Sequence, residues 1–180
     1  MSKFRTILQS ADLLGRERYV ELSLFSALGS RSLEVEETDA MLWLASSAQS
    51  HAWRARLLEE LLPVSLGLPG VDEVTRSPGS LSDEIVQMIR SQGDGAAILD
   101  TLGRVLYPDM LSAYRAHLVS CSPAADLATS LVLRRVIGDL ECRLDELHEV
   151  IELDEGPLGP SSAVVAELLE RVGGPFGPLE

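Results

Sequence analysis

The sequence predicts an all-α fold, a four-helix bundle in which one long connection joins two pairs of helices. Leucine and alanine dominate the composition and aromatic residues make up only 4% of the chain, which suits helix-on-helix packing. Apolar residues recur every three or four positions over long stretches, as they do in amphipathic helices. Prolines and glycines gather between residues 63 and 93. The 180 residues are enough for one domain with a sizeable core.

The first pair of helices is predicted over residues 3–29 and 37–62. Gly29 is a natural stop for the first helix, and Pro63 ends the second. Because the connection between them is short, we expect the two helices to be antiparallel neighbours. Polar residues interrupt both apolar stripes, at Arg18 and Glu21 in the first helix and at His51 in the second.

A long crossover is predicted over residues 63–93, because this stretch is rich in proline and glycine. Within it, LSDEIVQMIRS is amphipathic and predicts a helix of about three turns. Neither half of the chain could bury its apolar stripes alone, so we interpret the stretch as a connection and not as a boundary between domains.

The second pair of helices is predicted over residues 95–120 and 123–152. Pro108 removes one backbone hydrogen bond, which predicts a kink or a restart near Tyr107. Ser122 is a good N-cap for the fourth helix, and Pro123 suits its first position. The bundle is therefore expected to span residues 1–153. Residues 154–180 are expected to form a short helix, about 162–172, and a flexible tail.

The order of these elements is a helix pair, a long crossover and a second helix pair. A four-helix bundle with one long crossover has the ferritin-like topology. In bundles of this kind that hold two iron ions, two helices each give one inward Glu and the other two each give Glu-x-x-His. Residues three apart share a helix face, so both members of such a pair can reach the metal ions.

Four residues of this chain are candidate metal ligands at similar levels of the predicted bundle: Glu21, His51, Asp109 and Glu141. Both Glu-x-x-His pairs lack one member, because Ala48 precedes His51 by three positions and Leu144 follows Glu141 by three. A carboxylate-rich site would suit iron or manganese. An alternative without metal is a buried Arg18–Glu21 ion pair, joined by Glu141. A third possibility is that some of these side chains point outward.

Other polar and aromatic residues suggest weaker sites. Arg18, Trp53 and Tyr114 could line a pocket in the bundle core, where Trp43 would add a second indole for a small apolar ligand. The simpler interpretation is that these aromatic residues pack the core or a dimer contact. His117 lies near a helix end and is expected on the polar surface.

Charge and motif content narrow the function further. The net charge of −13 argues against nucleic acids and anionic membranes as partners, because both are bound mainly by Lys and Arg. Cys121 and Cys142 show no metal-binding or redox spacing and are expected to be reduced thiols. No apolar run near the N-terminus predicts a signal peptide or a membrane span, so we expect a cytoplasmic protein. No phosphate loop or dinucleotide motif is found.

Five short motifs stand out along the chain: Glu21-Leu22-x-Leu24-Phe25-x-x-Leu28-Gly29, His51-Ala52-Trp53-x-Ala55, Tyr114-Arg115-Ala116-His117-Leu118, Ser122-Pro123-x-x-Asp126 and Asp139-x-Glu141. Together they resemble a group of uncharacterised actinobacterial ferritin-like proteins with degenerate di-iron ligands. The broader superfamily includes ferritins, di-iron oxygenases and a tRNA-modifying hydroxylase. The resemblance spans residues 5–150 and implies the ferritin-like fold. It implies no activity, since the group has none assigned.

The incomplete ligand set favours a non-catalytic interaction or structural protein that forms a homodimer and needs no cofactor. Two alternatives stay open at the level of sequence. The first is a metal-dependent oxidase or hydroxylase of a small molecule, with iron or manganese held by the four candidate ligands and Tyr114 nearby. The second is a binder of a small apolar ligand in the bundle core.

Overall fold

The computed structural model describes residues 5–64, 68–92, 94–150 and 157–177, and every regular element in these ranges is helical. The protein is therefore all-α, as predicted. Its elements are α1 (Ile7–Arg31), α2 (Thr38–Glu59), α3 (Val71–Val74), α4 (Ser80–Ser91), α5 (Gly95–Thr101), the π-helix η1 (Leu102–Leu106), α6 (Tyr107–Ser120), α7 (Leu127–Val150) and α8 (Pro160–Val172).

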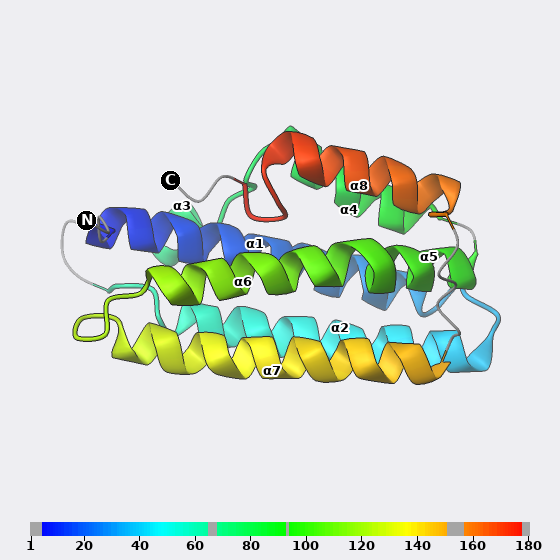
Figure 1. Ribbon diagram of the computed structural model, residues 1–180, viewed down its shortest axis with the longest axis horizontal. Helices are drawn as coiled ribbons and strands as arrows, with labels where there is room; N and C mark the ends of the chain where they lie inside the picture. The colour runs from blue at the N-terminus through cyan, green and yellow to red at the C-terminus, as the bar shows by residue number, and fades with distance from the viewer. Residues whose placement is uncertain (1–4, 65–67, 93, 151–156, 178–180) are drawn as a thin grey trace.

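The helices form three stacked layers, each of two helical rods (Figure 1). α4 and α8 form one outer layer, and α2 and α7 form the other. The middle layer holds α1 and the continuous run α5–η1–α6, so both of its members are covered on two sides. Buried leucines from all three layers join in one apolar core: Leu24, Leu44, Leu99, Leu102, Leu133, Leu140, Leu168 and Leu169.

The first helix pair follows the sequence prediction, except that α1 runs through Gly29 and ends at Arg31. α1 begins with a capping box, in which the Thr6 side chain accepts a hydrogen bond from the Gln9 backbone and the Gln9 side chain accepts one from the Thr6 backbone. α2 ends three residues before Pro63 at the Glu60 cap. The helix predicted inside the crossover is α4, whose apolar side includes the buried Ile85 and Ile89.

The fourth long helix begins later than predicted, at Leu127 and not at residue 123. Ser122 and Pro123 lie in a turn, in which the Ser122 backbone N–H donates to the Asp126 side chain at 2.7 Å. The Asp126 side chain thus provides a hydrogen-bond acceptor for a backbone N–H of the turn. The Asp126 backbone carbonyl accepts a hydrogen bond from the Ser130 N–H in the first turn of α7. The predicted helix limits at residues 3 and 152, and the predicted boundary at residues 153 and 154, lie outside the described residues.

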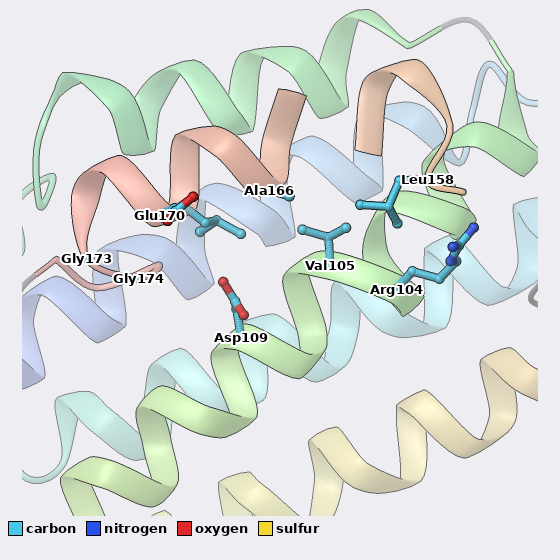
Figure 2. A pocket seen from close by; sticks show the side chains of 9 residues that line it. Arg104, Val105, Asp109, Leu158, Ala166, Glu170, Gly173 and Gly174 are labelled. Carbon is cyan, nitrogen blue, oxygen red and sulfur yellow. The ribbon is translucent and has the colours of Figure 1, made fainter. Parts of the chain in front are cut away.

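The irregularity predicted near Tyr107 is a π-helical turn. η1 ends at Leu106 and is capped by Tyr107, whose backbone N–H donates to the Leu102 carbonyl five residues earlier. Pro108 has no N–H to donate, so the wider turn lets the helical run continue without a break. The run then presents Tyr107 and Tyr114 to the interior, where both are fully buried, while Asp109 lies toward α8 (Figure 2).

The described part of the C-terminal segment packs against the core. After α8, the chain folds back and buries Phe176 completely, with its ring centroid 4.7 Å from that of Tyr114. Arg16 Nη1 donates to the Phe176 carbonyl at 2.9 Å. The aromatic side chain thus anchors the segment to the core, and the glycines serve the turn, since Gly174 and Gly177 have positive φ. Residues 178–180 of the predicted tail lie outside the described part.

None of the helices that the structure describes is both long and apolar enough to span a membrane. The longest ones, α1, α2 and α7, carry polar residues along their faces. Their buried polar side chains converge in the interior, and these side chains form the candidate functional site.

Candidate functional site

Glu21 lies at the centre of a buried polar network. Its side chain is fully buried on α1. Arg54 of α2 donates from Nε to both carboxylate oxygens, at 3.0 and 3.1 Å. The Tyr114 hydroxyl of α6 donates to Oε1 at 2.6 Å, and His51 Nδ1 lies 2.6 Å from Oε2. Two helices, α2 and α6, thus give Glu21 four contacts, and contacts of this kind allow a buried carboxylate to stay charged.

Helical spacing explains how these side chains meet. Ser47, His51 and Arg54 follow one another by four and three positions, so they share the face of α2 that points inward. Tyr107 and Tyr114 are seven residues, or about two turns, apart and share the inward face of α6. α1 and α2 pack along their length, which brings Glu21 level with both His51 and Arg54.

The contacts of His51 favour one tautomer. Its Nε2 lies 3.0 Å from the Tyr107 hydroxyl, which itself lies 2.6 Å from the Ser47 hydroxyl. Glu21 Oε2 and Arg54 Nη2 both lie near Nδ1, at 2.6 and 2.8 Å. Because the carboxylate is nearer and cannot approach a bare Nδ1 so closely, we assign the proton to Nδ1, which donates it to Glu21. Tyr107 then donates to Nε2 and accepts from Ser47. One directed chain of hydrogen bonds therefore runs from Ser47 through Tyr107 and His51 to Glu21.

The charges of the network favour a neutral His51 and an ionised Glu21. Burial and the nearby Arg54 charge lower the pKa of His51. Burial alone would raise the pKa of Glu21, but the charge of Arg54 and the hydrogen bonds from His51 and Tyr114 lower it overall. Burial likewise works against the charge of Arg54, yet the Glu21 carboxylate raises the pKa of the guanidinium.

Asp139 and the two tyrosines complete the network. Arg54 Nη1 donates to the Asp139 side chain of α7 in a short ion pair, so the guanidinium joins α1, α2 and α7. Burial raises the pKa of Tyr107 to about 12. Burial and the Glu21 charge raise the pKa of Tyr114 well above its ordinary value. Both phenols are therefore neutral donors at physiological pH.

A second buried pair lies one turn from Glu21. Glu17 Oε1 lies 2.7 Å from His117 Nδ1 and joins α1 to α6. Glu17 is fully buried and His117 is 3% exposed, which corrects the prediction that His117 lies on the polar surface. The His117 side chain projects from the last turn of α6 toward α1 and not toward solvent. The second oxygen of Glu17 has no hydrogen bond with the described residues.

The structure brings together two of the four candidate metal ligands and separates the other two. Glu21 and His51 are in contact. Asp109 faces the space between α6 and α8. Glu141 lies at the surface and pairs with Arg115 at 2.6 Å. The prediction that these four residues converge is therefore wrong, because the inward face of α6 is taken by tyrosines and that of α7 at this level by Asp139.

The alternative ion pair and the proposed pocket are also placed differently. Arg18 pairs with Glu59 at 2.8 Å and donates to Thr75 at 2.8 Å, so the predicted Arg18–Glu21 pair is wrong. Trp53 is 43% exposed, whereas Trp43 is buried with its ring centroid 6.0 Å from that of Tyr107. Ten residues separate the two tryptophans, a rotation of about 80° between helical turns, enough to put them on different faces. Arg18, Trp53 and Tyr114 therefore line no common pocket.

The donor set of the interior does not fit a metal ion. Among the described residues, no group of three or more His, Cys, Asp and Glu side chains is arranged to hold one. The Arg54 guanidinium contacts both oxygens of Glu21 and has Nη2 only 2.8 Å from His51 Nδ1. A metal ion on Glu21 and His51 would therefore lie against a fixed positive charge, and its repulsion would be strong in a buried site.

Sequence reasoning missed Arg54, Tyr107, Ser47 and Asp139. Arg54 offered a usable signal, since it follows His51 by three positions and so shares its helix face. An arginine on an inward face needs a carboxylate partner, and Glu21 was available at the same level. Glu141 was chosen in place of Asp139, two residues earlier, because only tertiary packing decides which of two nearby acidic residues faces inward.

Comparison of the chain with protein-family models, with curated proteins and with solved structures found no match. The roles of these residues are therefore argued from their geometry and chemistry.

Proposed function

We propose that the chain is a ferritin-like four-helix bundle in which a guanidinium takes the central position, and that it acts through protein contacts and not through catalysis. The order of a helix pair, a long crossover and a second helix pair supports this fold, with α1, α2, the run α5–η1–α6 and α7 as the four members. The motifs around Glu21, His51, Tyr114 and Asp139 support it as well.

The observation that carries the proposal is the position of Arg54. Its guanidinium satisfies both oxygens of Glu21 and reaches Asp139 on the far side. Each polar side chain of the Glu21 network thus has a partner within the network, and the central members are fully buried. A saturated and closed network supports a structural role, since a catalytic group needs a face open to substrate.

Protein contacts would use the outer side of the α1–α2 pair. Leu42 and Trp53 are eleven residues apart, so they share one face of α2, and they are 58% and 43% exposed. Phe25 on the neighbouring helix α1 is 43% exposed. Exposed large apolar side chains are typical of interaction surfaces, and aromatic residues are enriched there. A second copy of the chain is the proposed partner.

Metal titration tests the non-catalytic part of the proposal. Purified protein is titrated calorimetrically with Fe(II) without oxygen, with Mn(II) and with Zn(II), and thermal unfolding is followed in parallel. We expect no stoichiometric binding and no rise in Tm, for both the wild type and His51→Ala. Binding of one or two ions that raises Tm in the wild type and is lost in His51→Ala would overturn the proposal and favour the metal-dependent oxidase.

Sedimentation velocity tests the contact surface. We expect the wild type to sediment as a dimer and Trp53→Glu to sediment as a monomer with an unchanged helical spectrum. Leu131→Glu is the matched control, because Leu131 is a similarly exposed residue (54%) on α7, and it should leave the dimer intact. A wild type that is monomeric at all concentrations, or a dimer that withstands Trp53→Glu, would contradict this surface.

A further inference from the structure

A cleft opens between α8 and the middle layer, next to η1 and the start of α6 (Figure 2). Its volume is about 450 Å³, which is within the range of small-molecule sites. Arg104, Val105 and Asp109 come from η1 and the start of α6. The opposite wall comes from α8 and the segments that flank it, with Leu158, Ala166, Leu169, Glu170, Gly173 and Gly174.

The carboxylate of Asp109 is the most unusual group in this cleft. It is half-buried, yet no hydrogen bond or ion pair joins it to the residues that the structure describes. Burial without a compensating charge raises the pKa of Asp109. Figure 2 shows the side chain directed from α6 toward α8, so its oxygens are presented to whatever occupies the cleft.

The remaining charges leave the cleft with an excess of negative charge. Glu170 adds a second carboxylate from α8 and has no side-chain partner within the described ranges. Arg104 is the cation of the lining, and its charge is offset by Asp100 at 3.3 Å, while it also donates to the Pro157 carbonyl. An anionic ligand would therefore meet two carboxylates and an already paired guanidinium.

The rest of the lining is apolar. Val105 and Leu169 are buried side chains on opposite walls, and Leu158 and Ala166 lie beside them. A hydrated divalent ion such as Mg²⁺ or Ca²⁺ needs many oxygen ligands, and this lining offers two carboxylates beside hydrocarbon. An organic cation with a short hydrocarbon chain matches both parts of the lining at once.

The π-turn gives a reason for the position of these groups. η1 adds an irregular turn just before Tyr107, and single π-turns inside α-helices are frequent at functional sites. Val105 and Asp109 are four residues apart and share the face toward α8, while Tyr107 keeps the inward face. One helical run thus serves the interior network on one side and the cleft on the other.

We propose that the cleft between α6 and α8 binds an aliphatic ammonium ion, whose charged head pairs with Asp109 and whose hydrocarbon chain lies between Val105 and Leu169. Glu170 adds negative charge at the rim. This site is separate from the interior network and from the α1–α2 surface, so it stands whether or not the proposed function is correct.

Ligand titration by NMR tests the proposal with hexylamine as the probe and with 1-hexanol and hexanoate as matched controls. All three have the same chain, so they differ only in the head group. We expect saturable binding of hexylamine, with the alcohol and the acid weaker by about tenfold or more, since a hydrogen bond between two charged groups is stronger than one to a neutral group. Equal binding of 1-hexanol would overturn the proposal, because the charge would then have no role.

Two variants and one control locate the binding. Asp109→Asn should weaken hexylamine binding by about tenfold or more, and Ala166→Leu should weaken it by occupying part of the cleft. Glu167→Gln removes the same charge from an exposed position of α8 outside the lining and should leave the affinity within about twofold. Thermal unfolding confirms that each variant is folded. Unchanged affinity in Asp109→Asn, or tighter binding of Mg²⁺ than of hexylamine, would overturn the assignment.

Discussion

Two polar regions lie on opposite sides of the helical run α5–η1–α6. Each contains a carboxylate removed from water, but only the carboxylate of the inner region has partners within the protein. On the inner side, Glu21 is fully buried and has hydrogen bonds from Arg54, His51 and Tyr114. On the outer side, Asp109 is half-buried and has no partner among the described residues. The first carboxylate has a lowered pKa and the second a raised one.

The difference separates a structural role from a binding role. A buried charge whose partners come from the protein itself holds helices in register, and its loss is felt as instability. A carboxylate that is partly desolvated without a partner costs stability and gains from a ligand that supplies the missing charge. The two regions should therefore respond to mutation in opposite directions, and the following variants test that contrast.

The largest effect is expected for Arg54→Met. The variant leaves Glu21 buried without its cation, which should lower the free energy of unfolding by about 3–5 kcal/mol. Urea denaturation measures the loss. Arg18→Met is the matched control, because its ion pair with the half-exposed Glu59 should contribute less than about 1 kcal/mol. Equal losses in the two variants would show that the buried Arg54 ion pair contributes no more to the free energy of unfolding than the surface pair of Arg18.

Tyr107→Phe should have an intermediate effect. The variant removes the hydroxyl that joins Ser47 to His51 and leaves His51 Nε2 buried without a donor. We expect a loss of about 1–3 kcal/mol in urea denaturation. Tyr19→Phe serves as the control, since the Tyr19 hydroxyl bonds to Asp83 in a partly exposed position and should cost less. An unchanged free energy of unfolding in Tyr107→Phe would contradict the proposed chain of hydrogen bonds from Ser47 to Glu21.

The pH dependence of stability should report the state of Glu21. Its pKa is lowered in the folded protein, so its stabilisation is fully present above the ordinary value of 4.5 and is lost as the pH falls through the folded value. In Arg54→Met the same carboxylate is buried without a cation, which raises its pKa and makes the fold recover as Glu21 becomes protonated. Urea midpoints of the two proteins should therefore converge below about pH 4.5, whereas a constant difference down to pH 3 would contradict the ion pair.

The smallest effect, and the one of opposite sign, is expected for Asp109→Asn. Since burial raises the pKa of Asp109, its charge costs stability at neutral pH, and the neutral amide should raise Tm slightly. The cost disappears as the pH falls through the raised pKa, so the wild type and the variant should become equal in acid. Differential scanning calorimetry at pH 7 and pH 4 measures both values, with Glu167→Gln as the surface control. A clear drop in Tm would mean that Asp109 has a structural partner.

Local rules were sufficient for the helices and insufficient for the side-chain partners. The periodicity of α1, α2 and α7 and the proline at position 108 predicted the elements and the irregular turn. The sequence also singled out Glu21 and His51, because a polar residue in the middle of an apolar stripe can be recognised without a structure. Which acids face them depends on the rotation of α6 and α7, and there the choice of Asp109 and Glu141 was wrong.

The C-terminal segment shows the same limit. The composition of GGPFGPLE predicts a flexible tail. It does not reveal that one aromatic residue, Phe176, packs against Tyr114. Arg54 was missed for a related reason, since an arginine in a charged stretch is usually at the surface. Tertiary packing decided both cases, and no local pattern carries that information.

A double-mutant cycle between Glu21 and Arg54 tests the central claim most directly. The free energies of unfolding of the wild type, Glu21→Met, Arg54→Met and the double variant are measured by urea denaturation at pH 7. Each single variant strands one buried charge and the double variant strands neither at this contact, so we predict that the double loss is smaller than the sum of the single losses by about 2–3 kcal/mol. A coupling energy near zero would contradict a fold whose interior is organised by the Arg54 guanidinium.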